Sequence, residues 1–563
     1  MSVVDESFDL VVLGAGAGGL TAATVAARHG LATLLVEKSS LVGGTTAVSG
    51  GMIWVPDNHL MRHAGFADSR EAARSYLAAT VSEATARAGL ESYLDAAPEA
   101  IRWLCEHTEV ELQPVVRYPD YYPDLPGATL GGRVLEPVPF DASRLGEAFS
   151  WLRPPLPEFT ILGGMMVARA DIAHFRRFAT SPASAARVVR LVLRHLRERL
   201  SHPRGTSLVL GNALVGRLLL SARSAGVDIR RSTNVRSLAF ENGRCSGVQL
   251  AGAGTGRTIH ARRGVVLATG GFSHDPQLRR RLMPSVADEV SATVGVAGGG
   301  GLMLAEAAGA AVAAGFADPA LWVPVSRYTA SDGHAVIYPH TVTDRSKPGV
   351  IAVDMSGRRF VNEAVSYHEF VRAMLRSPNG SARRVHLICD SRAIWRYGFG
   401  AITPFTLRLE PYVKAGYLKR AEDLGQLARQ IGVDEATLED TVMRFNEGAA
   451  RGEDPEYGRG RDAYQRHLGD ADQKPNPCVA PIVKSPFYAI ELRPGDLGTA
   501  VGIRTDADAR VLSPGGSALP GLYAVGNDAA SIMHGNYPGP GITLGPALTY
   551  GYRAARAASA DRP

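Results

Sequence analysis

The sequence predicts an α/β protein (α+β overall), and the prediction begins with the first 37 residues. Apolar residues at 8–13 have the pattern of a buried strand, and Gly-Ala-Gly-Ala-Gly-Gly follows at 14–19. An alanine-rich stretch is then expected to be helical to about Arg28, and a second apolar strand at 32–36 ends on Glu37. Strand, glycine turn, helix and strand in this order are typical of the first unit of a Rossmann-like domain.

The composition is that of a folded protein with more than one domain. The chain has 563 residues, of which 45% are hydrophobic and 21% charged, and this length favours two or three domains. Its four cysteines lie far apart and form no C-x-x-C pair, which excludes a disulfide framework and a zinc ribbon. We therefore expect reduced thiols and no metal site.

Charge and targeting signals exclude further classes of protein. The formal net charge of +6 is small for this length and no nucleic-acid-binding motif accompanies it, so no nucleic-acid partner is expected. The first residues are acidic and lack the apolar core of a signal peptide, and no apolar run reaches the roughly 18 residues of a membrane-spanning helix. We therefore expect a cytoplasmic protein.

Strand patterns return later in the chain, on both sides of a region of different character. The segment 70–110 is helical by period, whereas 114–140 is rich in proline, glycine and tyrosine and is expected to be a loop. From about 322 to 495 the pattern changes to short strands, loops and two helices, which favours a second domain. Further strands are expected at 227–240, 247–250, 264–268 and 522–525, and the two helices at 421–432 and 434–451.

The glycine turn at 14–19 predicts a dinucleotide site. Gly14, Gly16 and Gly19 lie between a strand and a helix, so that main-chain N–H groups and the positive end of the helix dipole face a pyrophosphate. Glu37 follows Gly14 by 23 residues, where its carboxylate can accept ribose hydroxyls and disfavours a 2′-phosphate. A tight turn without a ligand is the alternative for an isolated motif, and the strand and helix around this one argue against it.

Three further glycine-rich turns favour FAD over NAD. They lie at 43–51, 268–271 and 526–527, and each permits close approach of the main chain. Together they suit a long dinucleotide with an isoalloxazine ring better than ordinary loop glycines do. The residues expected to line the FAD site are Gly14, Gly16, Ala17, Gly18, Gly19, Glu37, Lys38, Ser39, Gly44, Thr45, Thr46, Ser49, Gly50, Gly51, Val235, Ala268, Thr269, Gly270, Gly271, Gly526, Asn527, Gly541, Thr543 and Leu544.

Six motifs from both ends of the chain resemble one known superfamily. They are GAGAGG, GGTTAVSGG, ATGGF, GRRFVNE at 357–363, LYAVGN at 522–527 and GNYPGPGITLGPALTYG at 535–551. This set resembles the fumarate reductase/succinate dehydrogenase flavoproteins, which fold as a discontinuous FAD-binding domain with an inserted α+β catalytic domain. The resemblance implies FAD-binding segments at 1–321, with a basic helical insertion at about 150–210, and at 496–563, around a catalytic domain at 322–495. Respiratory members carry a covalent flavin on a histidine where this chain has Gly44, which implies non-covalent FAD.

Two tyrosines stand where fumarate reductases have the arginines that bind a dicarboxylate. One such arginine follows the Asn-Glu pair, where this chain has Tyr367, and another ends a His-Gly-x-Asn-Arg stretch, where it has Tyr537. Two buried carboxylates need cationic donors, so neutral phenols argue against a dianionic substrate. A phenol can instead donate to a ketone oxygen, and a second can remove the α-proton if its pKa, about 10 unperturbed, is lowered. The pair therefore favours α,β-desaturation of a ketone.

The tyrosine pattern resembles the 3-ketosteroid Δ1-dehydrogenases. In that family the tyrosine of a Tyr-x-Gly-Pro-Gly motif and the N–H of its last glycine hold the C3 carbonyl, and these match Tyr537 and Gly541. Tyr367 matches the base proposed for the C2 proton, and Tyr121, or alternatively Tyr122, matches a third tyrosine that supports this base. The resemblance implies 1,2-desaturation of 3-oxo-Δ4-steroids, with hydride passing from C1 to flavin N5. Electrons would then leave to a quinone or another acceptor.

Other functions stay open on the sequence alone. A 3-oxo-5α-steroid 4-dehydrogenase or another fumarate-reductase-like enone reductase fits similar residues, and a flavin-containing lipid-binding protein at a membrane surface would need no turnover. Packing is the alternative role for each tyrosine, because the chain has 18. We expect His534 to be a turn or packing residue, and Asn362 and Glu363 to fix loops.

Residues 169–204 account for the positive surplus of the chain, with nine arginines against two acidic residues. In a helix over 187–200 the arginines share one face, and a largely apolar face opposes them. Such a helix predicts peripheral contact with the inner face of a membrane, and a solvated helix packed on the protein is the alternative. A similar insertion is a feature of the cholest-4-en-3-one Δ1-dehydrogenase subgroup, which accepts substrates with intact side chains. The arginines are 187, 190, 194 and 197, and the apolar residues are Val189, Val192, Leu193, Leu196 and Leu200.

Overall fold

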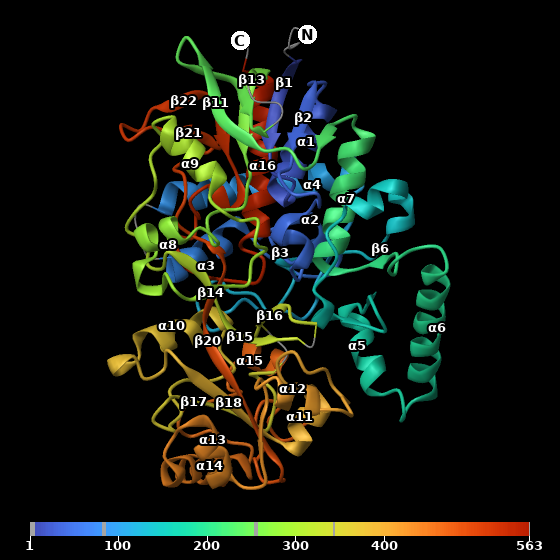
Figure 1. Ribbon diagram of the computed structural model, residues 1–563, viewed down its shortest axis with the longest axis vertical. Coiled ribbons are helices and arrows are strands. Elements are labelled where there is room, and N and C mark those ends of the chain that lie inside the picture. The colour runs from blue at the N-terminus through green and yellow to red at the C-terminus, as the bar shows by residue number, and fades with distance from the viewer. Residues whose placement is uncertain (1–5, 82–85, 253–256, 331, 342–343, 562–563) are drawn as a thin grey trace.

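The computed structural model describes residues 6–81, 86–252, 257–330, 332–341 and 344–561, and it is elongated (Figure 1). The first and last segments of the chain together build the upper part of the molecule in this view, and most of residues 320–490 build the lower part. The mixed α/β fold class predicted from the sequence is confirmed.

An eight-stranded sheet forms the upper part, with strand order β10-β2-β1-β13-β12-β11 and with β22 and β21 continuing from β13. Strands β10, β2, β1, β13 and β22 run parallel, and the carboxyl ends of the last four meet at one edge because Leu13 pairs with both Val36 and Leu267, and Leu267 with Ala524. In parallel α/β sheets this edge is where ligands bind. The strands are β1 (Glu6–Leu13), β2 (Thr33–Val36), β10 (Asp228–Arg230), β11 (Val235–Glu241), β12 (Arg244–Leu250), β13 (Thr258–Leu267), β21 (Arg510–Leu512) and β22 (Ala518–Ala524).

Helices from distant parts of the chain cover this sheet. Helix α1 packs between α16 and α7, and Gly551 of α16 lies so close to Gly18 that a Cβ there would be 2.7 Å from the Gly18 oxygen. The predicted helical segment 70–110 contains two helices, α3 and α4. The helices of this part are α1 (Ala17–Arg28), α2 (His59–His63), α3 (Arg70–Thr80), α4 (Arg87–His107), α7 (Leu210–Ser224), α8 (Pro276–Leu282), α9 (Gly300–Ala307) and α16 (Leu544–Ala560).

A second, seven-stranded sheet forms the lower part around the long central strand β20. Its strands are β14 (Val290–Ser291), β15 (Ala320–Thr329), β16 (Ala335–Pro339), β17 (Val350–Val353), β18 (Val385–Asp390), β19 (Lys419–Ala421) and β20 (Phe487–Thr499). Its helices are α10 (Tyr367–Arg376), α11 (Ser391–Tyr397), α12 (Glu410–Lys414), α13 (Leu424–Ile431), α14 (Glu435–Ala449) and α15 (Ala463–Leu468). The predicted domain boundaries at 321 and 495 fall inside β15 and β20, and the division into domains stays a prediction.

One stretch expected to be a loop contains a strand. Val134 and Leu135 of β5 pair with Trp54 and Ile53 of β3, so the expectation of a loop throughout 114–140 is wrong there. Two buried hydrophobic residues in a proline-rich stretch were enough to complete a small sheet. The short strands are β3 (Ile53–Trp54), β4 (Leu112–Pro114), β5 (Val134–Pro137), β6 (Phe140–Asp141), β7 (Thr160–Ile161), β8 (Met165–Met166) and β9 (Ser207–Leu208).

The basic insertion holds helices α5 (Arg169–Arg176) and α6 (Pro182–Arg199), and α6 lies at the edge of the molecule (Figure 1). The side of α6 that packs on the protein carries Ser184, Val188, Leu191 and His195. Most of the predicted apolar face is exposed instead: Val189 is 47% exposed, Leu193 61%, Leu196 54% and Leu200 85%. The helix therefore has three faces, which are buried, apolar and arginine-bearing. No helix in the described ranges is both long and apolar enough to cross a membrane.

Candidate active site

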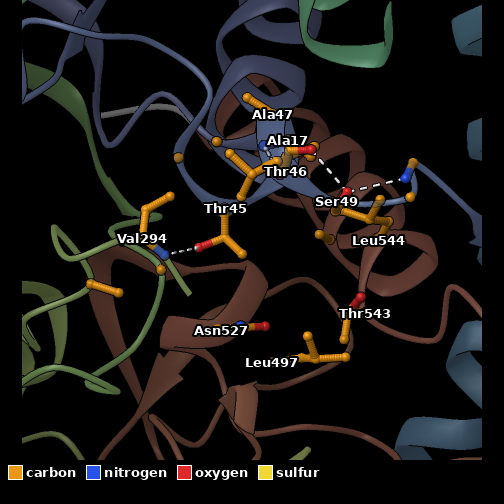
Figure 2. A pocket seen from close by; sticks show the side chains of 18 of the residues that line it. Ala17, Thr45, Thr46, Ala47, Ser49, Val294, Leu497, Asn527, Thr543 and Leu544 are labelled. Atoms are coloured by element: carbon orange, nitrogen blue, oxygen red, sulfur yellow. Dashed lines mark hydrogen bonds between the residues drawn. The ribbon is translucent and has the colours of Figure 1, made fainter. Parts of the chain in front are cut away.

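A cavity of about 560 Å³ runs from the carboxyl edge of the first sheet to the insertion. Figure 2 shows part of its wall, where side chains from the segments after β1, before α16 and after β22 face one another. The cavity is thus built from both ends of the chain.

The glycine turn forms one wall of this cavity. Gly14 has a φ of +106°, and a Cβ there would lie 2.3 Å from the Ala268 oxygen, so only glycine fits. Gly16 caps α1 without a side chain, and Gly16, Ala17 and Gly18 line the cavity. The first turn of a helix with free N–H groups is suited to an anion such as a pyrophosphate.

Glu37 is held at the mouth of this turn by main-chain donors. One carboxylate oxygen accepts from the Ala15 N–H at 2.9 Å, and the other accepts from the Ser39 N–H at 2.8 Å. The carboxylate still has lone pairs for ribose hydroxyls, because each oxygen can accept more than one hydrogen bond. Glu37 and Lys38 both line the cavity.

The hydroxyls of the segment 44–51 shape the segment itself (Figure 2). Thr46 Oγ1 accepts from the Ala17 N–H at 3.2 Å, and Thr45 Oγ1 accepts from the Val294 N–H at 3.3 Å. Ser49 Oγ donates to the Thr46 oxygen at 2.8 Å and accepts from the Gly51 N–H at 3.1 Å. The segment is thereby fixed close to the start of α1.

Sequence reasoning missed Asp528, a buried carboxylate behind the cavity wall. It accepts hydrogen bonds from the Thr269 N–H at 2.5 Å, the Thr269 hydroxyl at 3.0 Å and the Gly271 N–H at 2.9 Å. Asp528 therefore fixes the turn after β13 to the turn after β22. Its position directly after Gly526-Asn527 was the signal that could have identified it.

The cavity brings together nearly all residues predicted to line the FAD site. Three of them do not line it: Gly19 and Gly271 permit close packing, and Ser39 forms a hydrogen bond within its own turn. Gly19 lies against Gly14, where a Cβ would be 1.9 Å from the Gly14 oxygen, and Gly271 lies against Thr499 in the same way. Ser39 Oγ accepts from the Leu41 N–H at 3.0 Å. The glycine cradle and the fixed carboxylate fit FAD, which supplies a hydride acceptor when bound.

Three predicted tyrosines meet at another part of the same cavity. Tyr367 begins α10, and its hydroxyl donates to the Tyr537 hydroxyl at 2.8 Å. The Tyr121 ring centroid lies 5.7 Å from that of Tyr367 and 5.6 Å from that of Tyr537. All three side chains are buried and line the cavity.

Tyr121 and Tyr122 are distinguished by where their hydroxyls point. The Tyr122 hydroxyl donates to Glu369 Oε1 at 2.7 Å. The Tyr121 hydroxyl has no hydrogen-bond partner among the described residues. Of the two, only Tyr121 lines the cavity, so geometry favours it as the third tyrosine of the site.

The loop that carries Tyr537 and Gly541 is fixed from several sides. The Pro538 oxygen accepts from the Tyr76 hydroxyl at 2.5 Å and from the Tyr121 N–H at 3.1 Å. Gly541, at φ +100°, lines the cavity, and a Cβ there would be 2.6 Å from the Ile53 nitrogen. A side chain at Gly541 would therefore displace the main chain beside it.

Arg372 supports the loop of Tyr537, and the three nearby residues that the sequence excluded from chemistry have structural contacts. Arg372 donates to Asp318 at 2.6 Å and to Asn536 Oδ1 at 2.9 Å, next to Tyr537. His534 stacks on Phe316. Asn362 and Glu363 fix loops as expected, since the Asn362 amide donates to the Tyr457 oxygen and Glu363 accepts from two arginines.

Burial makes these phenols weak acids. It raises the pKa of Tyr537 to about 12, which the hydrogen bond from Tyr367 partly opposes. It raises the pKa values of Tyr367 and Tyr121 well above the usual value. Each of these phenols is therefore mostly protonated near neutral pH.

The insertion adds a group of mostly apolar residues to the cavity that the sequence did not identify as a substrate wall. They are Pro155, Leu156, Phe159, Ile161, Met166 and Ile172. Arg169 also lines the cavity, and its guanidinium pairs with Glu136 at 3.3 Å. The part of the cavity that these residues line is largely apolar, and we call it the apolar chamber.

Residues 9–544 match the FAD binding domain family, in agreement with the cradle described above. The protein is an FAD-dependent oxidoreductase.

It is 37% identical to the 3-oxosteroid 1-dehydrogenase of Mycobacterium tuberculosis over 98% of both chains. It is 38% identical to the 4-oxocyclohex-2-ene-1-carboxylate 5-dehydrogenase of Sinomonas cyclohexanicum, over 97% of this chain and 93% of the relative. The crystal structure of the 3-ketosteroid delta1-dehydrogenase from Sterolibacterium denitrificans in complex with 1,4-androstadiene-3,17-dione matches with a TM-score of 0.91 and 36% identity, over 99% of this chain and 100% of that one. The chain belongs to the 3-oxosteroid 1-dehydrogenase family.

Proposed function

We propose that the protein is a 3-oxosteroid 1-dehydrogenase, which converts 3-oxo-Δ4-steroids to 1,4-dienes with FAD as the first acceptor. The observation that carries the proposal is that the hydrogen-bonded pair Tyr367 and Tyr537, together with Gly541, lines the same cavity as the glycine cradle. The family to which the chain belongs supports the same reaction.

Each residue has a distinct role in this proposal. Tyr537 and the Gly541 N–H donate to the C3 carbonyl oxygen and stabilise the negative charge that develops there. The ionised oxygen of Tyr367 takes the C2 proton, so that an O–H bond forms as the C–H bond breaks. The C–H electron pair becomes the new C1=C2 bond as hydride leaves C1. FAD, which the glycine cradle and Glu37 would hold, would supply the acceptor for that hydride. Tyr121 packs against this base and supports it.

The apolar chamber favours a steroid over the small carboxylate named for the Sinomonas relative. Phe159, Ile161 and Met166 line it, and apolar walls gain free energy by covering a large apolar skeleton. A carboxylate would need an unpaired cation, whereas Arg169 is already paired with Glu136. Because the ring-ketone chemistry is the same for both substrates, the choice between them rests on this wall.

The test is anaerobic mixing of the FAD-loaded protein with single substrates, followed by flavin absorbance. We expect 4-androstene-3,17-dione and cholest-4-en-3-one to bleach the flavin, and a 5α-3-ketosteroid, 4-oxocyclohex-2-ene-1-carboxylate and succinate to leave it yellow. Bleaching by 4-oxocyclohex-2-ene-1-carboxylate alone would show that the substrate is a small ring ketone and not a steroid. Bleaching by none of the five would contradict a dehydrogenase of either kind.

We further propose that FAD is bound without a covalent link, because Gly44 offers no nucleophile in the segment beside the start of α1. Acid precipitation should therefore release all flavin into the supernatant.

We propose a quinone as the acceptor of the electrons, since a lipid-soluble acceptor suits a protein with an exposed apolar helix face. Steady-state rates with a soluble ubiquinone analogue and with NAD⁺ test this directly, and higher turnover with NAD⁺ would overturn it.

We also propose that α6 rests on an anionic membrane surface at the inner face of the membrane. Leu193, Leu196 and Leu200 form an exposed apolar strip beside arginines at 190, 197 and 199. Burying such a strip at an interface removes it from water while the arginines reach lipid phosphates. Ile172 lies both on the cavity wall and at the surface, 47% exposed, so a lipid-dissolved substrate has a short path inward.

Vesicle co-sedimentation tests this contact. Wild type should sediment with vesicles that contain phosphatidylglycerol and remain in solution with phosphatidylcholine alone. A Leu193→Ser/Leu196→Ser variant should lose binding, whereas Met443→Ser, an exposed methionine on α14, should keep it. If the α6 variant sediments like wild type, or if wild type elutes as a dimer that the variant abolishes, the strip contacts something other than lipid.

A further inference from the structure

The three site tyrosines lie on three segments that are far apart in the sequence. Tyr121 belongs to the loop between β4 and β5, Tyr367 begins α10, and Tyr537 lies in the segment between β22 and α16. The hydrogen bond between the hydroxyls of Tyr367 and Tyr537 is 2.8 Å long, so a small displacement of either segment would break it. The geometry of the site therefore depends on the contacts that hold these segments together.

Arg372 connects α10 to the segment that carries Tyr537. Its Nη2 donates to Asn536 Oδ1 at 2.9 Å and to the Gly535 main-chain oxygen at 3.3 Å. The Asn536 amide in turn donates to the Met533 oxygen at 3.1 Å, which fixes this side chain within its own turn. Because a guanidinium is planar, its donors have fixed directions. Arg372 therefore sets where the residue just before Tyr537 lies relative to α10.

Glu369, on the same helix, connects α10 to the segment that carries Tyr121. Its Oε1 accepts from Arg372 Nη1 at 2.8 Å and from the Tyr122 hydroxyl at 2.7 Å. Tyr122 directly follows Tyr121 in the chain. One carboxylate oxygen thus joins the helix of the expected base to the segment of the third tyrosine.

Asp318 holds the same guanidinium from a third direction. Its Oδ2 accepts from Arg372 Nε at 2.6 Å, and its Oδ1 accepts from the Trp322 indole N–H at 2.7 Å. The side chains of Arg372 and Asp318 are only 11% and 10% exposed. A buried ion pair adds little stability compared with apolar packing, but it specifies how the groups that it joins are placed. We call this set of side chains the Arg372 network: Tyr122, Asp318, Glu369, Arg372 and Asn536.

We propose that Arg372 is a positioning residue that sets the distance between the base Tyr367 and the carbonyl donor Tyr537. Glu369 extends this control to the segment of Tyr121. The proposal rests on the proposed function, because it explains how tyrosines on different segments act on one ring ketone. None of the five members of the network lines the cavity, so Arg372 acts on the reaction only through the tyrosines. A misplacement of about 1 Å at such a pair can slow a reaction by about 10²-fold.

A double-mutant cycle on flavin reduction tests the proposal, with the FAD-loaded protein and the ring ketone that reduces wild type fastest. Arg372→Gln should slow reduction by about tenfold or more in otherwise wild-type protein, because the tyrosine pair loses its alignment. In the Tyr537→Phe background the same substitution should slow reduction by less than about threefold, because the pair is already broken. Equal factors in the two backgrounds would indicate a general structural effect and overturn the proposal.

Further variants separate position from charge. Glu369→Gln keeps an oxygen that can accept from Tyr122 and Arg372, whereas Glu369→Leu keeps none, so the glutamine variant should be faster by about fivefold or more. Equal rates in these two variants would overturn the role of Glu369. Arg372→Lys keeps the charge without the planar fork and should recover only part of the rate, and full recovery would contradict positioning by the guanidinium. Arg376→Gln, at an exposed arginine one turn later on α10, is the matched control and should reduce flavin like wild type.

A crystal structure of the FAD-loaded variant without substrate gives a readout that needs no turnover. In Arg372→Gln, or in Arg372→Lys if the glutamine variant does not fold, the hydroxyls of Tyr367 and Tyr537 should lie more than about 3.5 Å apart, outside hydrogen-bond distance. A pair that keeps its distance of 2.8 Å would overturn the proposal. If no ring ketone reduces the wild-type flavin and the pair still separates in the variant, the proposed function fails and this inference stands.

Discussion

The nucleotide end and the tyrosine end of the cavity differ in how their chemistry arises. At the nucleotide end, a short segment of backbone forms the cradle, and Gly14 fits because a side chain would collide with Ala268. At the tyrosine end, the side chains come from positions as far apart as Tyr121 and Tyr537, and their acidity depends on burial and on neighbours in space. The nucleotide end thus depends on the local conformation of the backbone. The tyrosine end depends on the electrostatic environment that distant segments create together.

Substitutions at the two ends should therefore impair the protein in different ways. A change at the nucleotide end alters shape and should abolish cofactor binding. A change at the tyrosine end keeps the cofactor and should alter the rate and its pH dependence. The following predictions test that separation, in order of decreasing effect.

Gly14→Ala should remove FAD altogether, because the new Cβ would meet the Ala268 oxygen at 2.3 Å in a left-handed conformation. The flavin content of the purified protein, read from its absorbance, is the measurement. Gly30→Ala is the control, since Gly30 has a similar φ of +83° with no atom within 4 Å of its Cβ. Full flavin content in Gly14→Ala would show that this turn does not hold the cofactor.

Tyr367→Phe and Tyr537→Phe should each retain FAD and slow flavin reduction by about 10²-fold or more. This is the scale of losing a general base or an oxyanion donor. Anaerobic stopped-flow absorbance with a 3-oxo-Δ4-steroid measures the rate constant. A loss of flavin in either variant would contradict the expectation that the tyrosine end affects the rate and not cofactor binding.

The rate of flavin reduction should rise with pH, roughly tenfold per unit below the apparent pKa of the base. The sign follows from burial: it raises the pKa values of Tyr367 and Tyr537, so the ionised base is a minor species near neutral pH and increases with pH. The pH profile of the stopped-flow rate constant measures this slope. A profile that falls with pH would assign the proton to a different group.

Tyr121→Phe should slow flavin reduction by about tenfold, whereas Tyr122→Phe should change it by less than about threefold. Tyr121 packs on both site tyrosines, but the Tyr122 hydroxyl is engaged by Glu369. Both variants keep an aromatic ring, so each serves as the control for the other. The reverse order of effects would exchange the two tyrosines in the site.

The sequence predicted the nucleotide end well because its signals are local. The strand, turn and helix around Gly14 lie within about thirty residues, and Glu37 follows at a fixed spacing. Ser39 is an exception. Ser39 lies beside predicted contacts but turns its hydroxyl to the Leu41 N–H, and such side-chain direction is not encoded by spacing.

The tyrosine end was only partly accessible to sequence reasoning. Tyr367 and Tyr537 were predicted from the motifs around them, but the insertion residues Phe159, Ile161 and Met166, which line the same cavity, lie in stretches without a motif. The α6 helix shows a similar limit. The spacing of its apolar residues predicted an apolar face. Only the fold shows that Val188 and Leu191 pack inward while Leu193 and Leu196 remain exposed.

Asp528 has a consequence for the order in which the protein becomes functional during synthesis. It joins the turn after β13 to the turn after β22, and β22 itself pairs with β13. More than nine-tenths of the chain must therefore leave the ribosome before these two turns can meet. We expect nascent chains that stop before β22 to emerge without flavin, so that the yellow colour of the protein reports on translation past Asp528 as well as on folding.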